Sequence, residues 1–343
     1  MAGNDRERNV IKKIVGMKEF TLIVIWAVLV FILWMFNHNY LSPGNIRNIF
    51  NSAFVTGILA VGLSCLLIGG KIDLSAGNTG MMAGVIISIL LRDGFHWIPA
   101  VIVTLLFGAV TGLINAFFVN GLGFAPFIST LAISSIFGGL ALVFTNSANI
   151  PISSQDHAAF LALGTKNFWI FPVPFIIAVV LLVLYGVILS STGFGRRVYM
   201  TGGNANAARL AGINPKKITT ILFVNNSVIA SIAGMLFAAL MQMGSPIAIS
   251  GSDLDGITAA ILGGVAFTGG TGNMFGVFIG IMMLTSFQNG LVVAGLEGYY
   301  RVVAKGLLLI GALILDYYRE NARLKSLKAG AESGATSARM EAE

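Results

Sequence analysis

The sequence predicts an all-α membrane protein with about ten transmembrane helices. Of its 343 residues, 56% are hydrophobic and only 10% are charged, whereas a soluble domain has about 25% charged residues. The apolar residues also form long runs, because no charged residue occurs between Asp93 and Asp156 or between Lys217 and Asp253. Since about 20 apolar residues cross a bilayer, each of these intervals can hold one or two spans.

Breaks in hydropathy divide the chain into a basic arm (1–18), a transmembrane domain (19–318) and a tail (319–343). The tail ends in an Ala-, Gly- and Ser-rich stretch, so we expect it to be disordered. We expect outer loops at 146–167 and 244–256. The predicted spans are 20–36, 48–69, a segment ending at 91, 97–119, 124–145, 168–190, 218–243, two within 257–294, and 300–318.

Positive charge predicts the orientation of the chain. The arm, the loop 191–217 and the tail hold 15 of the 21 Lys and Arg residues. Because cytoplasmic loops carry an excess of Lys and Arg, we expect both termini and this loop to face the cytoplasm. This distribution accounts for the net charge of +7 without a nucleic-acid partner.

The loop 191–217 contains a short predicted helix. Asn204 can cap its N-terminus, residues 205–211 are mostly helix formers, and Gly212 can close its C-terminus. Pro215 prevents continuation. Composition alone leaves two interpretations open, a docking element or a solvated loop that only sets topology.

Catalytic and metal-binding motifs are absent from the sequence, so we expect no enzyme activity, no metal and no cofactor. His38, His96 and His157 lack metal-ligand spacing, and no nucleophile stands beside a base. A P-loop is also missing, because Gly70-Lys71 is followed by Ile72 where Ser or Thr would bind magnesium.

Ionisable residues at membrane depth are candidate functional groups. Asp73 and Lys71 lie at a glycine-flanked helix break, where we favour a position at the membrane interface over one lining a vestibule. Asp253 and Asp255 are expected at the outer end of a span, and Lys305 is expected to extend outward to the interface. The scarcity of membrane-depth carboxylates disfavours an ion-coupled carrier.

Uncharged amides form a second group of candidates. They can hydrogen-bond a sugar along a translocation path, or they can join helices, and we favour the second role. These residues are Asn115, Asn225, Asn226, Gln288 and Asn289.

Two glycine-rich stretches resemble each other, one beginning at Gly69-Gly70 and one at Gly263-Gly264. Transporters are often built from internal repeats. Small residues at shared packing positions explain the similarity equally well.

Three motifs together resemble the permeases of ribose-type bacterial ABC importers, over about residues 45–318. The first is the run Ile72-Asp73-Leu74-Ser75-Ala76-Gly77. The second comprises Gly202, Gly203, Asn204, Ala207, Ala208, Arg209, Leu210, Ala211, Gly212 and Ile213. The third is Ile261-Leu262-Gly263-Gly264, with Gly269-Gly270-Thr271-Gly272. One departure is Lys71, where the family commonly has a small residue.

The resemblance implies a multi-pass permease of the bacterial inner membrane with the type II importer fold. It further implies a second permease copy, an ATPase subunit that alone uses ATP, and an extracytoplasmic sugar-binding protein. The helix from Asn204 to Ala211 would be the coupling helix that seats in the ATPase, and Asp73, Leu74, Ser75, Gly77, Gly263 and Gly264 would belong to a gate. We favour docking for Arg209, and topology for Arg196 and Arg197.

The expected function is therefore ATP-driven sugar import by alternating access. The alternatives are a stand-alone ion-coupled carrier and an ABC permease for a non-sugar solute. The sequence does not indicate which sugar is carried or whether the two permease copies are identical.

Overall fold

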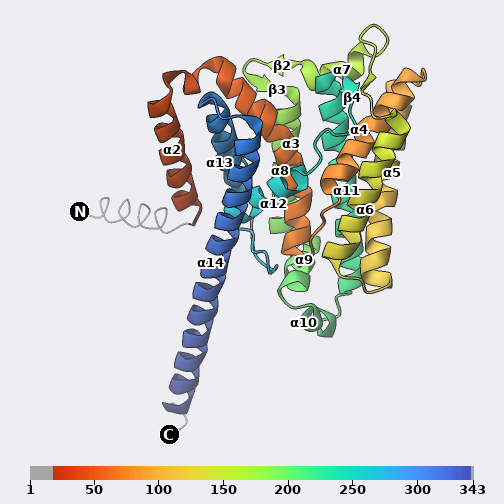
Figure 1. Cartoon of the computed structure of the whole chain (residues 1–343). Helices are drawn as coiled ribbons and strands as arrows, with labels where there is room; N and C mark the ends of the chain where they lie inside the picture. Colours follow the sequence, from red (N-terminus) through yellow and green to blue (C-terminus); the bar gives the residue numbers. More distant parts are fainter. Residues whose placement is uncertain (1–17, 341–343) are drawn as a thin grey trace.

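The computed structural model describes residues 18–340, and this part of the chain is mostly helical, which confirms the predicted all-α class (Figure 1). The helices are α2 (Lys18–Phe36), η1 (His38–Leu41), α3 (Pro43–Ile68), α4 (Ala76–Arg92), α5 (Trp97–Ala116), η2 (Phe117–Gly121), α6 (Pro126–Thr145), α7 (Ala158–Thr165), α8 (Val173–Ser191), α9 (Gly193–Gly203), α10 (Ala205–Leu210), α11 (Pro215–Met241), α12 (Ser252–Leu262), α13 (Met274–Val293) and α14 (Gly298–Met340). Two antiparallel strand pairs are β1 (Ile150–Pro151) with β4 (Met243–Gly244), and β2 (Asn167–Phe168) with β3 (Phe171–Pro172). Residues 1–17 of the predicted basic arm lie outside the described residues.

Seven of the described helices are long and apolar enough to cross a bilayer, namely α3, α5 with η2, α6, α8, α11, α13 and the first part of α14. Shorter apolar helices, α2 and α4, occupy two more predicted spans. The remaining predicted span falls on α12, which has only 11 residues. At 1.5 Å per residue α12 is about 16 Å long, roughly half of the hydrocarbon thickness.

The segment before α12 differs from the expected outer loop at 244–256. Gly251 has φ +76°, and α12 begins directly after it at Ser252. Upstream, the backbone of Ile249 lies against α4, where a Cβ on Gly77 would stand 3.1 Å from the Ile249 oxygen. This polar, glycine-containing segment is therefore only partly exposed, because Gly244 and Pro246 are buried while Ile247 and Ser250 are exposed, and its composition alone could not show which residues are buried.

The two ends of the bundle carry different elements. β2, β3, β4 and α7 lie at one end, whereas α9 and α10 lie at the other (Figure 1). We did not predict α9, because its four glycines lower its helix propensity. Its start is fixed by Thr192, whose side chain accepts a hydrogen bond of 3.1 Å from the Gly195 amide.

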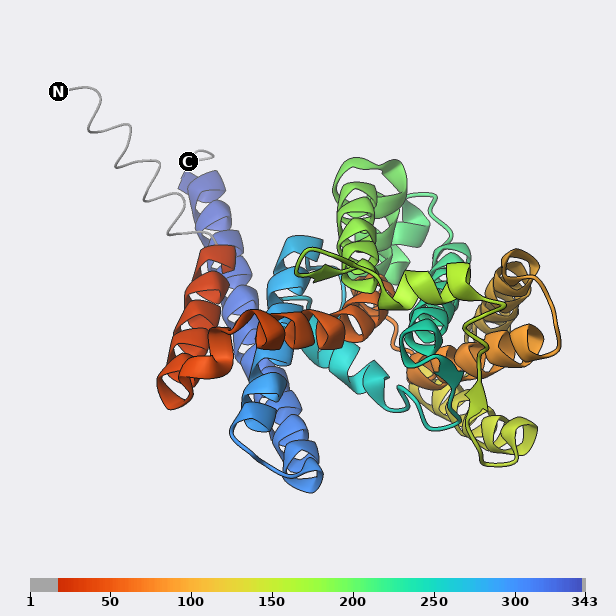
Figure 2. The same ribbon diagram turned by 90° about the horizontal axis from the view of Figure 1, so that it is seen from above.

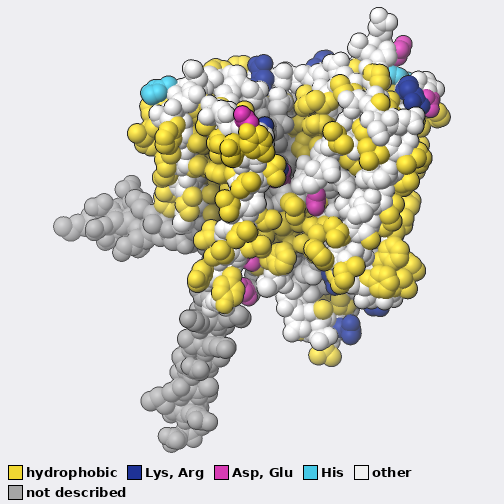
Figure 3. All heavy atoms as spheres, in the orientation of Figure 1, with side chains coloured by type: hydrophobic (Ala, Val, Ile, Leu, Met, Phe, Trp, Pro, Cys, Tyr) yellow, Lys and Arg dark blue, Asp and Glu magenta, His cyan; other side chains and the backbone are white. Residues whose placement is uncertain are grey.

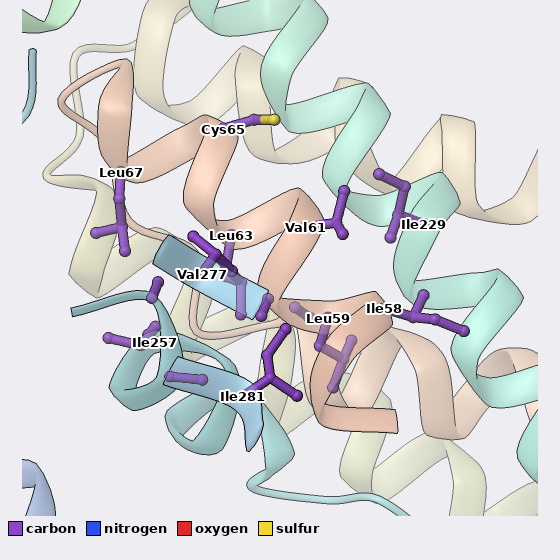
Figure 4. Packing of buried hydrophobic residues seen from close by; sticks show 14 of the residues in the cluster. Ile58, Leu59, Val61, Leu63, Cys65, Leu67, Ile229, Ile257, Val277 and Ile281 are labelled. Atoms are coloured by element: carbon purple, nitrogen blue, oxygen red, sulfur yellow. The ribbon is translucent and has the colours of Figure 1, made fainter. Parts of the chain in front are cut away.

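The core is organised around α3, which is buried along most of its length and packs against α8, α11, α12 and α13. Figure 4 shows Leu59 and Leu63 of α3 among side chains of neighbouring helices, including Ile257 of α12 and Ile281 of α13. Seen from above, α2 and α14 lie at one edge of the molecule and α5 and α6 at the opposite edge (Figure 2).

Apolar side chains cover the outside of the bundle, as expected where lipid replaces water (Figure 3). Leu106 of α5, Ile128 of α6 and Val183 of α8 are among the exposed large hydrophobic residues. The tail differs from our expectation of disorder, because α14 continues as helix to Met340. Residues 320–329 are rich in Ala, Leu, Glu, Lys and Arg, which are strong helix formers.

Candidate functional site

Three segments that are far apart in the sequence meet at the end of the bundle where α9 and α10 lie. They are the loop that follows α3, the end of α9, and the loop between α12 and α13. The Gly270 amide donates a hydrogen bond of 2.8 Å to the Ile68 oxygen, and Gly202 is packed against both residues. We name the five glycines at this contact the glycine junction, and they are Gly70, Gly202, Gly203, Gly269 and Gly270.

Only glycine fits the closest contacts of this junction. A Cβ on Gly269 would stand 2.8 Å from the Gly70 Cα, and a Cβ on Gly270 would stand 2.6 Å from the Gly203 Cα. Gly70, Gly269 and Gly270 also have φ of +72°, +93° and +74°, which other L-residues adopt only at a cost. The sequence did not predict that residues of, or next to, all three motifs touch.

A side-chain hydrogen bond adds to this contact. Tyr199 of α9 donates a hydrogen bond of 2.7 Å from its hydroxyl to the Gly272 oxygen. The end of α9 is therefore joined both to the chain that leads into α4 and to the chain that leaves α12.

Gly263 and Gly264 have the geometry of a helix end, and their expected part in a gate stays a prediction. They end α12 in the same hydrogen-bond pattern that Gly69 and Gly70 form at the end of α3. In both places a glycine with positive φ closes the helix, as in a Schellman motif. The same pattern recurs at Gly94 and Gly295, so a general helix cap accounts for this part of the internal similarity.

The predicted short helix is present as α10. The Asn204 side chain accepts hydrogen bonds of 3.0 Å from the amides of Asn206 and Ala207, and Gly212 has φ +79°. Ala208 is buried, whereas Leu210 is 90% exposed at the end of the helix. The five basic residues of 191–217 are exposed, and this stretch contains no acidic residue. α10 therefore presents an apolar tip within a positively charged surface.

A buried polar cluster precedes α4. One carboxyl oxygen of Asp73 accepts hydrogen bonds from the Ser75 amide (2.8 Å) and hydroxyl (2.6 Å), and the other accepts one from the Asn226 amide group (2.9 Å). Asn115 donates to the Ser75 hydroxyl over 2.9 Å. Asp73 is fully buried, so our expectation that it lies at the membrane interface was wrong. The loop 69–75 turns inward after α3 and carries Asp73 into the bundle.

A second polar cluster joins α12, α13 and α14. The Asp255 carboxyl group accepts hydrogen bonds from Lys305 Nζ (2.7 Å) and from Gln288 Nε2 (3.1 Å). Lys305 therefore points to Asp255, and not outward to the interface as we expected. Asp253 and Asp255 both lie in the first turn of α12, at a helix end, and both are buried, whereas the expected loop 244–256 would have exposed them. The pairing involves residues 50 positions apart, which hydropathy does not reveal.

Each of the five candidate amides hydrogen-bonds a residue on a helix other than its own, or on the loop that precedes such a helix. Asn289 exchanges hydrogen bonds with Asn45 at the start of α3 (2.8 and 3.0 Å). Asn225 accepts a hydrogen bond from the Tyr185 hydroxyl of α8. Asn115, Asn226 and Gln288 take part in the two clusters described above. These contacts are those of interhelical connectors, and a role in a substrate path stays a prediction.

The bundle of long apolar helices defines an integral membrane protein. Within residues 18–340 no three His, Cys, Asp or Glu side chains are grouped closely enough to hold a metal ion. Residues 45–313 match the family model described as the permease component of branched-chain amino acid transport systems. The chain therefore belongs to this family of transport permeases.

Named relatives support the same assignment. The ribose import permease protein RbsC of Bacillus subtilis is 32% identical over 84% of this chain and 89% of its own length. The L-arabinose transport system permease protein AraH of Escherichia coli is 32% identical over 89% of this chain and 92% of its own. The D-allose transport system permease protein AlsC of Escherichia coli is 32% identical over 81% and 84%. No solved structure matches the chain.

The hydrogen bonds of Asp73 predict different effects for two substitutions. Asp73→Ala leaves the donors of Ser75 and Asn226 unpaired, at about 1–3 kcal/mol for each buried group. Asp73→Asn keeps an acceptor for Ser75, and the Asn226 amide can rotate to accept from the new side chain, because its oxygen has no partner. We expect a clear loss of melting temperature in detergent for Asp73→Ala and a small one for Asp73→Asn. Equal losses would contradict this account, and Asp156→Ala in an exposed loop is the control.

The ion pair predicts a non-additive double-mutant cycle. Lys305→Met leaves the largely buried Asp255 carboxylate without a cation. Because the Lys305 side chain is itself 39% exposed, we expect a cost below the about 3–5 kcal/mol of a fully buried pair. Adding Asp255→Asn removes the stranded charge, so the double variant should melt higher than Lys305→Met alone. A double variant that melts at or below the single one would exclude this pairing in the membrane.

Proposed function

We propose that this chain is the permease subunit of an ATP-driven monosaccharide importer in the bacterial inner membrane. The names of the relatives described above contain ribose, arabinose or allose. All three of these compounds are monosaccharides. The substrate would be bound by hydroxyl-bonding side chains, and this bundle supplies buried Asn, Ser and Thr residues within its helices.

One observation carries the proposal, namely that the exposed helix α10 is directly continuous with the glycine junction. α9 ends at Gly203, which contacts Gly270, and α10 begins two residues later at Ala205. A partner that grips α10 would therefore act on the loops next to α4 and α12 through backbone contacts. Such a partner would be the ATPase subunit, because this chain has no P-loop of its own.

The mechanism follows from these contacts. When the ATPase subunits close, they move α10 and α9. The glycine junction passes this movement to the loop that carries Asp73 and to the end of α12. Rearrangement of α4 and α12 would then open the path to one side of the membrane at a time, with no ATP bound by the permease.

The same proposal sets the orientation and the other partners. The α9–α10 end would face the cytoplasm, as its positive charge indicates. The end with α7 and the β2–β3 hairpin would face the extracytoplasmic sugar-binding protein, and a second permease copy would complete the complex. Dependence of uptake on the ATPase subunit separates this function from an ion-coupled carrier. A screen of monosaccharides against other small polar solutes for ATPase stimulation separates a sugar permease from a non-sugar permease.

Leu210 and Arg209 are predicted to anchor the ATPase subunit. Truncation of an interface anchor costs about 2 kcal/mol or more, which corresponds to roughly 30-fold in affinity. We therefore expect Leu210→Ala and Arg209→Glu to reduce co-purification of the ATPase and ATP-dependent uptake, with unchanged membrane insertion. Lys166→Glu, a charge reversal at the opposite end, is the control for co-purification of the ATPase. Normal uptake by a correctly inserted Arg209→Glu protein would refute docking through this residue.

Two glycines with similar backbone angles test the role of the junction. Gly264 and Gly270 have φ of +89° and +74°, so Ala at either position pays about 1–2 kcal/mol for the left-handed conformation. Only at Gly270 does the new Cβ also meet another loop, whereas nothing lies within 4 Å at Gly264. We expect Gly270→Ala to lower the sugar transported per ATP hydrolysed, and Gly264→Ala to leave that ratio near normal. The same ratio in both variants would show that the junction does not couple the subunits.

A further inference from the structure

An apolar cavity of about 300 Å³ lies between α2 and the rest of the bundle. Its walls come from α2, η1, α3, β3, α8 and α13, and they include Trp26, Val30, Ile46, Ile49 and Phe278. Since these residues lie in the middle of α2 and α13 and near the start of α3, the cavity belongs to the half of the bundle that carries α7 and the β2–β3 hairpin.

The cavity offers nothing to a polar ligand. Trp26 donates a hydrogen bond of 3.1 Å from its indole nitrogen to the Ser286 hydroxyl, and Tyr40 donates one of 2.9 Å to the Ser286 oxygen. These contacts engage the polar groups of the three residues with one another. A water molecule needs two to four polar partners, and a sugar needs more, so neither is held here.

The cavity is partly open, and α2 forms its outer wall. α2 packs mainly against α13 and η1 and stands at the edge of the molecule (Figure 2). The outward side chains of α2 are apolar and exposed, among them Val28, Phe31 and Ile32. The surroundings of this opening are therefore acyl chains, and an unfilled cavity would leave its lining without van der Waals partners.

We propose that this cavity is a binding site for one acyl chain of a membrane phospholipid. One turn of a partner helix, about 10–12 Å across with its side chains and 5.4 Å long, fills roughly 400 Å³ or more, which exceeds the volume of the cavity, whereas part of a single hydrocarbon chain fits. The acyl chain fills the space between α2 and α8 where a neighbouring helix is missing, and it holds α2 against the bundle. This site is independent of the sugar path and of the α9–α10 surface.

Trp26 provides a direct probe of the occupant. A variant with Trp34, Trp97 and Trp169 changed to Phe keeps Trp26 as its single tryptophan, since the chain has four. It is reconstituted with its partners in vesicles of phosphatidylcholine, with or without bromine along the acyl chains, because bromine quenches tryptophan on contact. We expect strong quenching of Trp26 by the brominated lipid and weak quenching by acrylamide from the water phase.

Two cavity-filling variants separate a bound chain from the lipid outside. Val30→Phe on α2 and Ile46→Phe on α3 fill the cavity from different walls, and either one that folds is sufficient. We expect each to remove most of the quenching, while Val183→Phe on the exposed face of α8 does not. Quenching that is absent, or equal in the filled variants and the parent, would overturn the proposal, and so would stronger quenching by acrylamide.

Discussion

The arrangement of this protein depends on a backbone contact that side chains would prevent. At the glycine junction, the chain after α3, the end of α9 and the loop after α12 approach one another closely enough that a single Cβ would collide with a neighbouring backbone. Three segments from different parts of the sequence thereby share one contact. Because backbone atoms form the contact, side-chain rearrangement cannot relieve a closer approach of any one segment to the other two.

The same physical device holds the helices inside the bundle. α11 packs against α4 and α5, and the backbones of Gly80 and Gly234 approach one another at the α4–α11 contact. Lipid gives no hydrophobic driving force between helices, so close approach and van der Waals contact have to stabilise their packing. The bundle and the junction thus use glycine for the same purpose, but the junction uses it between two loops and the end of α9.

The sequence predicted the features that depend on local chemistry. Hydropathy located most of the spans, and Asn204 with Gly212 located α10, because helix caps are set by residues within a few positions. The sequence did not predict features that depend on a contact with a residue far away in the chain. Nothing near Lys305 in the sequence indicates that Asp255 lies beside it. Likewise, the polar loop 69–75 has the composition of an interface segment, yet its fold carries Asp73 into the core.

Only part of the arrangement of the expected coupling residues was predictable from the sequence. The cap of α10 was predictable, whereas the contact of Gly202 with Gly270 was not, since it requires the fold of three separate loops. A family motif lies in or next to each of these segments, but the motifs do not indicate that the segments meet. The clue available in the sequence was the number of glycines in all three, which indicates close backbone approach but not its partner.

The depth at which α4 begins has an electrostatic consequence. The aligned peptide dipoles of a helix place about half a positive charge at its N-terminus. Asp73 bonds to the Ser75 amide at this end of α4, and a Cβ on Gly77 in its first turn would stand 2.7 Å from a carboxyl oxygen of Asp253. The backbone of α4 therefore supplies positive potential for two carboxyl groups buried inside the bundle. Because this potential falls off within one helical turn, a small tilt of α4 changes the electrostatic field at the centre of the bundle.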